Sequence, residues 1–149
     1  MRFNMEGEKE EISNVNFDDP IFYQHYNDKK SENYAFIEKV LINLALCHTV
    51  IIENKDGQIN YNASSPDELA LVNAARFFGM KFIDRDEEGV MTINYKGEIV
   101  KYQLLNFIEF NSTRKRMSVI VRNEKGVIKC LCKGADSILF PLLKNTKEN

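Results

Sequence analysis

The second half of the chain is a succession of short apolar segments separated by glycine-containing turns. These segments, rich in valine, isoleucine, phenylalanine and tyrosine, span residues 80–84, 91–95, 98–110, 117–122 and 127–133. Such composition favours β-strands, and Glu88-Gly89, Lys96-Gly97 and Lys125-Gly126 mark turns between them. Because connections this short join antiparallel neighbours, the pattern predicts an antiparallel sheet.

Helical patterns surround the predicted sheet. Residues 32–46 place apolar side chains at three- and four-residue spacing, which predicts an amphipathic helix. In a second helix, Ser65 can cap, Pro66 suits the first helical position, Glu68 completes a capping box and Gly79 ends the helix. Further expected elements are a short helical turn that starts at 18–20, a hairpin of 50–53 with 58–61 across Lys55-Asp56-Gly57, and a closing helix over 135–143.

The expected fold class is therefore α+β, with an antiparallel sheet of about five to seven strands flanked by helices. The 149 residues suit one domain. We expect residues 1–16 to be a flexible lead-in, residues 17–143 to be the domain and residues 144–149 to be a flexible tail.

Composition limits the expected binding partners and the expected cellular compartment. A net charge of −2 gives no reason to expect nucleic acid, and no run reaches the roughly 18 apolar residues of a membrane span. Three cysteines favour a reducing compartment, with Cys130 and Cys132 on one side of a strand acting as small hydrophobes. Cys47 and His48 are adjacent, which is not typical of a zinc site, and the position of His48 at a helix end favours a cation in a structural role.

Two segments carry groups that suit a nucleotide. Residues 110–119 read Phe-Asn-Ser-Thr-Arg-Lys-Arg-Met-Ser-Val, and Lys133-Gly134 ends the last predicted strand. An aromatic ring can stack on a base, while cations and close backbone can hold phosphates. The residues alone leave other interpretations open: a core phenylalanine, a solvated loop of cations, a nucleic-acid contact, or an interaction module without nucleotide. Neither a Gly-x-x-x-x-Gly-Lys loop nor a Gly-x-Gly-x-x-Gly fingerprint is present.

Taken with Ser-Pro-Asp-Glu at 65–68 and Leu-Ala-Leu-Cys-His-Thr-Val at 44–50, these segments resemble the cytoplasmic nucleotide-binding domain of type-IV P-type ATPases, the phospholipid flippases. The resemblance runs from about Phe17 to Phe140. Lys133 to Ser137, Lys-Gly-Ala-Asp-Ser, matches a signature of P-type ATPases generally.

The resemblance implies a role for each candidate nucleotide-binding residue. Phe110 would stack on adenine, with Met117 as an apolar neighbour. Glu68 would accept from the adenine amino group, and Lys133 would lie deep in the adenine pocket, with Gly134 allowing close backbone approach. Lys115 would lie near the phosphates. Asn111 and Ser112 can hydrogen-bond the base or sugar.

The resemblance also implies the chemistry of a parent protein. Such a parent hydrolyses ATP through an aspartyl-phosphate to move a phospholipid across a membrane, with Mg²⁺ held mainly by a phosphorylation domain. The Asp-Lys-Thr-Gly sequence that accepts the phosphoryl group is absent, so we expect no catalytic residue and no metal site here, and no activity of this chain alone. We expect a C-terminally truncated, monomeric domain at the cytosolic face of a membrane. Its partners would be the phosphorylation and actuator domains and an accessory subunit. A flippase-like module of a fused cyclase or regulatory protein, or a non-catalytic interaction module, remains the alternative.

Overall fold

A computed structural model describes residues 15–144, so the expectations for residues 1–14 of the lead-in and 145–149 of the tail lie outside it. The helices in this range are α1 (Pro20–Asn27), α2 (Glu32–Leu46), α3 (Pro66–Phe77) and α4 (Asp136–Leu139), followed by a 3₁₀ turn at Phe140–Leu142. The strands are β1 (Ile51–Lys55), β2 (Gln58–Asn62), β3 (Met80–Arg85), β4 (Val90–Tyr95), β5 (Glu98–Ile108), β6 (Arg116–Asn123) and β7 (Ile128–Gly134).

The strands form two antiparallel sheets, which confirms the expected α+β class. Strands β3 to β7 follow one another in chain order in a five-stranded meander, and β1 pairs with β2 in a separate hairpin. The hairpin turns through Asp56 and Gly57, which have φ values of 55° and 78°. A tight turn with positive φ at both central residues matches the twist of its strands, as the Asp-Gly sequence predicted.

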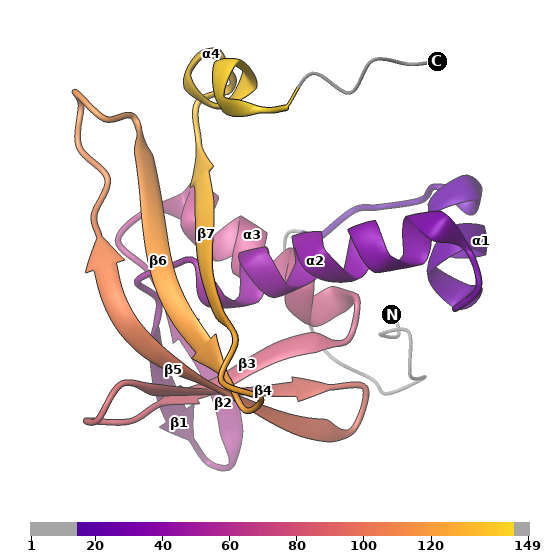
Figure 1. Ribbon diagram of the computed structural model, residues 1–149. Coiled ribbons are helices and arrows are strands. Elements are labelled where there is room, and N and C mark those ends of the chain that lie inside the picture. Colours follow the sequence, from indigo (N-terminus) through magenta and orange to yellow (C-terminus); the bar gives the residue numbers. More distant parts are fainter. Residues whose placement is uncertain (1–14, 145–149) are drawn as a thin grey trace.

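Irregular pairing bends the larger sheet. The register shifts between Phe82 and Asp84 in β3 and between Leu104 and Asn106 in β5. An extra residue in one strand increases its local bend and twist. The long strand β5, in the middle of the sheet, is curved, and the sheet bends into a trough rather than a flat plane (Figure 1).

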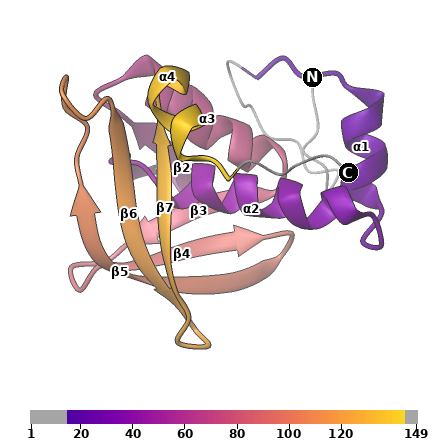
Figure 2. The same ribbon diagram turned by 45° about the horizontal axis from the view of Figure 1, so that its top comes forward.

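The helices gather on one side of this trough. Helices α2 and α3 pack against each other and against β3, and α2 also contacts β7 (Figure 2). The buried core lies between these helices and the sheet, and its largest fully buried hydrophobic side chains are Tyr26, Leu46, Val50, Val72, Met80, Phe82, Met91, Ile93, Val119 and Val121. Helix α4 stands at the end of β7, away from the floor of the trough.

The start of α3 and the closing helix differ from the expectations. Ser65 makes no side-chain cap hydrogen bond, so the predicted capping box is wrong. Glu68 turns inward instead, where other donors meet its carboxylate. The helix expected over 135–143 is α4 and a 3₁₀ turn, because Pro141 has no N–H to donate to a helical carbonyl. Within residues 15–144, no helix has the length and apolarity needed to cross a membrane.

Candidate functional site

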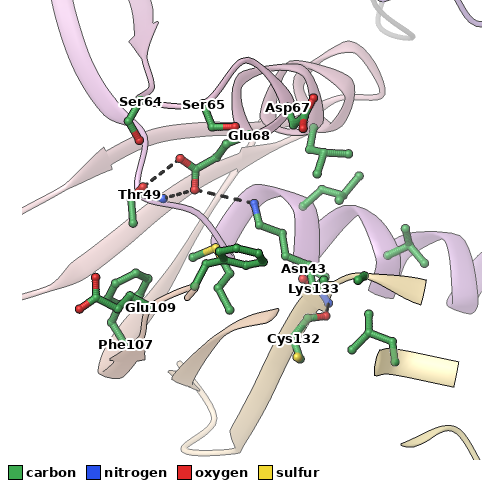
Figure 3. A pocket seen from close by; sticks show the side chains of 18 residues that line it. Asn43, Thr49, Ser64, Ser65, Asp67, Glu68, Phe107, Glu109, Cys132 and Lys133 are labelled. Carbon is green, nitrogen blue, oxygen red and sulfur yellow. Dashed lines mark hydrogen bonds and ion pairs between the residues drawn. The ribbon is translucent and has the colours of Figure 1, made fainter. Parts of the chain in front are cut away.

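A cavity of about 870 Å³ opens between α2, the start of α3, the ends of β5 to β7 and α4. Figure 3 shows its side chains converging from these elements. Its lining consists of Val40, Asn43, Leu44, Thr49, Ser64, Ser65, Asp67, Glu68, Leu71, Phe107, Glu109, Phe110, Met117, Cys132, Lys133, Gly134, Ala135 and Leu139. Five of the eight predicted site residues are therefore brought together in one cavity, from segments up to 66 positions apart (68 to 134).

Of the three acidic residues that line the cavity, Glu68 is the buried one. It lies in the first turn of α3 and is 8% exposed. Its Oε1 accepts a hydrogen bond from the backbone N–H of Thr49 at 2.7 Å, and its Oε2 accepts from the Thr49 hydroxyl at 2.9 Å. These two bonds hold a buried carboxylate in one orientation.

Lys133 faces Glu68 from the end of β7. Its Nζ lies 3.8 Å from Oε1 of Glu68, which is an ion pair but too long for a hydrogen bond (Figure 3). The Lys133 ammonium is buried and has no hydrogen-bond partner among the described residues. Burial lowers the pKa of Lys133, and the charge of Glu68 opposes this change. Unused donors on a buried cation cost free energy, which a ligand acceptor can recover.

The two predicted apolar contacts lie on the same cavity but differ in exposure. Phe110, just beyond the end of β5, is 58% exposed, whereas Met117 of β6 is only 6% exposed. An exposed ring on a cavity wall is a surface on which a flat ligand can stack. The core interpretation of Phe110 is therefore wrong, and Met117 is both a core residue and part of the cavity lining.

The loop between β5 and β6 carries the three predicted residues that do not line the cavity. Asn111 Oδ1 accepts from the backbone N–H groups of Thr113 and Arg114, at 3.0 and 2.7 Å, so its side chain shapes the loop. Ser112 and Lys115 are exposed. Their contacts with a sugar or phosphates remain a prediction.

Gly134, the last residue of β7, packs against the end of this loop. A Cβ at Gly134 would lie 2.5 Å from the Lys115 carbonyl oxygen and 2.6 Å from Arg116 Cβ. Next to it, the Ala135 N–H donates to that same carbonyl at 3.0 Å. Close packing against the protein's own backbone therefore requires glycine here, in addition to any approach by a ligand.

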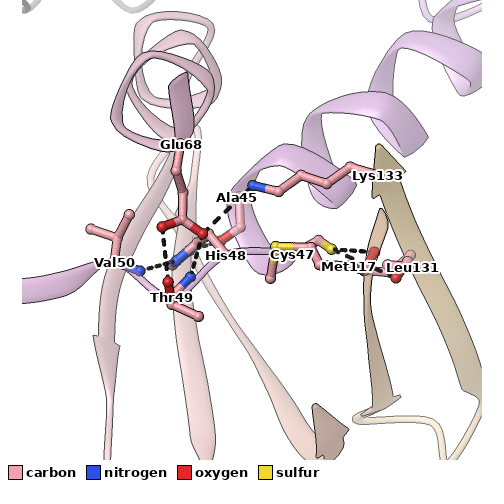
Figure 4. Close-up of polar contacts among 9 residues, drawn as sticks. All are labelled: Ala45, Cys47, His48, Thr49, Val50, Glu68, Met117, Leu131 and Lys133. Carbon is pink, nitrogen blue, oxygen red and sulfur yellow. Dashed lines mark hydrogen bonds and ion pairs between the residues drawn. The ribbon is translucent and has the colours of Figure 1, made fainter. Parts of the chain in front are cut away.

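Behind the cavity, His48 and Cys47 are structural (Figure 4). His48 Nε2 donates to the Ala45 carbonyl and its Nδ1 accepts from the Val50 N–H, an arrangement that suits a neutral ring. Burial lowers the pKa of His48 to about 4, which overrides the cation expected at a helix end. Burial likewise raises the pKa of the Cys47 thiol to about 11.

The other two cysteines do not both behave as small core hydrophobes. Cys130 is exposed, and Cys132 is half-buried in the cavity lining. Both lie in β7, an edge strand of the sheet, and neither is fully buried. The prediction of an apolar environment for Cys130 is therefore wrong.

Sequence reasoning missed Thr49 and Asn43. Thr49 belongs to the Leu-Ala-Leu-Cys-His-Thr-Val segment, but its pairing with Glu68 joins residues 19 positions apart and has no local signal. Asn43 Nδ2 donates to the Cys132 carbonyl at 3.0 Å and ties α2 to β7 beside Lys133. In the sequence, Asn43 stands out only as a polar residue near the end of an amphipathic helix.

Comparison with known proteins agrees with this architecture. The sequence model of the P-type ATPase cytoplasmic domain N matches residues 36–146, and the chain belongs to this family. This result confirms the predicted family.

Individual relatives are phospholipid-transporting ATPases. The chain is 46% identical over 124 residues to human "Phospholipid-transporting ATPase IC", a match covering 82% of this chain and 10% of the relative. It is 57% identical over 106 residues to human "Probable phospholipid-transporting ATPase IM", covering 70% and 9%. It is 47% identical over 135 residues to "Phospholipid-transporting ATPase DRS2" of Saccharomyces cerevisiae (strain ATCC 204508 / S288c), covering 89% and 10%. The chain thus spans about a tenth of the length of these curated relatives.

Proposed function

We propose that this domain binds ATP in the cavity and serves as the nucleotide-binding domain of a phospholipid-transporting P-type ATPase. The observation that carries the proposal is the convergence of Phe110, Glu68 and Lys133 on one cavity. An exposed ring, an oriented acceptor and an unsatisfied buried donor match the flat face, amino group and ring nitrogens of adenine.

In this arrangement the base enters between Phe110 and the buried Lys133, and the phosphates point outward past the loop that carries Lys115. The Lys115 ammonium, which is exposed, then lies where the triphosphate leaves the cavity toward solvent. Phosphoryl transfer would take place on another domain of the parent, so this domain contributes binding and positioning. Transport of a phospholipid is carried over from the relatives' names and the family.

Magnesium has no site of its own in this proposal. Among residues 15–144, no group of three or more His, Cys, Asp or Glu side chains could hold a metal ion. The donor set does not fit a resident Mg²⁺, and we assign no step to one here. Any Mg²⁺ would arrive on the nucleotide phosphates.

Calorimetric titration of the 149-residue chain with ATP tests the proposal. We expect a Kd of about 0.1–1 mM, equivalent to roughly 4–5.5 kcal/mol. Lys133→Met keeps the aliphatic stem but removes the donor, and it should weaken ATP binding about tenfold, the value of one hydrogen bond to a charged group. Lys129→Met is the matched control, because Lys129 is exposed on the same strand and outside the cavity lining. Absence of ATP binding, or equal losses in both variants, would refute the assigned site.

Lys115→Ala separates the phosphate end from the base end. If Lys115 contacts phosphates, this change weakens ATP binding and leaves adenosine binding unchanged, because adenosine has no phosphate to lose. Equal effects on both ligands would place Lys115 away from the phosphates.

A further inference from the structure

Thr49 contributes two donors to one buried carboxylate. Its backbone N–H lies 2.7 Å from Glu68 Oε1, and its hydroxyl lies 2.9 Å from Oε2 (Figure 4). The residue follows the end of α2, whereas Glu68 begins α3, so the contact joins two separate walls of the cavity. A two-point grip of this kind fixes the plane of the carboxylate as well as its position.

The two carboxylate oxygens of Glu68 have different neighbours. Oε1 accepts a hydrogen bond from the Thr49 N–H and also lies 3.8 Å from Lys133 Nζ, within ion-pair range but too far for a hydrogen bond. Oε2 has the Thr49 hydroxyl as its single partner among the described residues. A carboxylate oxygen has two lone-pair directions, so Oε2 retains acceptor capacity.

We infer that Thr49 is a positioning residue for base recognition: by holding Glu68, it keeps Oε2 available to the 6-amino group of the purine. This inference rests on the proposed binding of ATP and extends it to the choice of base. Thr49 acts through Glu68 and need not touch the nucleotide. A freely rotating Glu68 would divide its oxygens between Lys133 and the ligand, and the preference for a 6-amino group would decline.

The test compares ATP with purine riboside 5′-triphosphate, which lacks the 6-amino group but keeps the ring nitrogens. The unaltered chain should bind ATP about tenfold more tightly, the value of one hydrogen bond to a charged group. In Thr49→Val, which removes the hydroxyl but keeps the shape and the backbone N–H, that ratio should fall below about threefold. The loss should fall on ATP, with purine riboside triphosphate unchanged.

Two variants serve as controls. Thr49→Ser keeps the hydroxyl and should retain the tenfold ratio. Thr92→Val makes the same chemical change in β4, outside the cavity lining, and should alter neither affinity. Equal weakening of both ligands in Thr49→Val, or an unchanged ratio, would overturn the inference.

A measurement on the unaltered chain covers the case in which Thr49→Val does not fold. The Thr49 amide proton donates to Glu68, so its NMR resonance should shift on ATP binding and shift much less with purine riboside triphosphate. Equal shifts would refute the role of Thr49 while leaving ATP binding intact. If neither ligand binds the unaltered chain, the proposed function fails and this inference fails with it.

Discussion

Replacement of Phe110 by alanine is the change that most clearly separates binding from folding. The ring is 58% exposed and lies outside the buried core, so its loss should alter the free energy of unfolding by no more than about 0.5 kcal/mol. Stacking of a base on an aromatic side chain is worth roughly 1–3 kcal/mol. The Kd for ATP should therefore rise by about 5- to 150-fold.

Calorimetry at high protein concentration, with urea unfolding of the same samples, measures both quantities. Phe36→Ala is the matched control, because Phe36 is 63% exposed but does not line the cavity. The control should bind ATP as the unaltered chain does. Equal affinity of the Phe110 variant and the unaltered chain would refute the stacking role, and a large loss of stability would show that the ring supports the fold.

Three further predictions concern the surroundings of the cavity. Gly134→Ala should destabilise the fold by about 1–3 kcal/mol in urea unfolding, because its Cβ would press on the Lys115 carbonyl; an unchanged midpoint would contradict this packing. His48 has a pKa of about 4 when folded against an ordinary 6.5, so the unfolded chain binds its proton first as pH falls. The contribution of neutral His48 to the free energy of unfolding is complete above pH 6.5, and about 2 kcal/mol of it should be lost by pH 5. His48→Asn should remove that part of the pH dependence of unfolding, and an undiminished slope in the variant would contradict this role. Alkylation at pH 8 followed by mass spectrometry should label exposed Cys130 first and spare Cys47, whose pKa is about 11; equal labelling in the folded state would contradict its burial.

The strands and helices were largely predictable because their signals are local. The five strands of the larger sheet and the helix over residues 32–46 lie within two residues of their predicted ends. Each depends on apolar spacing and on turn residues adjacent in sequence. Pro141 shortened the closing helix, a signal that was present in the sequence but outweighed by its apolar pattern.

Five residues of the cavity lining could be named from the sequence, but their contacts could not. The sequence offered Glu68 two competing roles, a capping box at the start of its own helix and a contact with a ligand. In the structure its carboxylate instead binds Thr49. Such a choice is decided by which donors the tertiary fold places near a buried carboxylate. The neutral state of His48 has the same origin, since burial outweighs the helix-end field.

The most direct test of the central claim is a two-dimensional amide NMR titration of this chain with ATP. We predict saturable shifts clustered at the amides of Thr49, Glu68, Phe110 and Lys133, with one common Kd. A well-dispersed spectrum in which these four amides do not respond to ATP would contradict the assignment of the cavity as a nucleotide site.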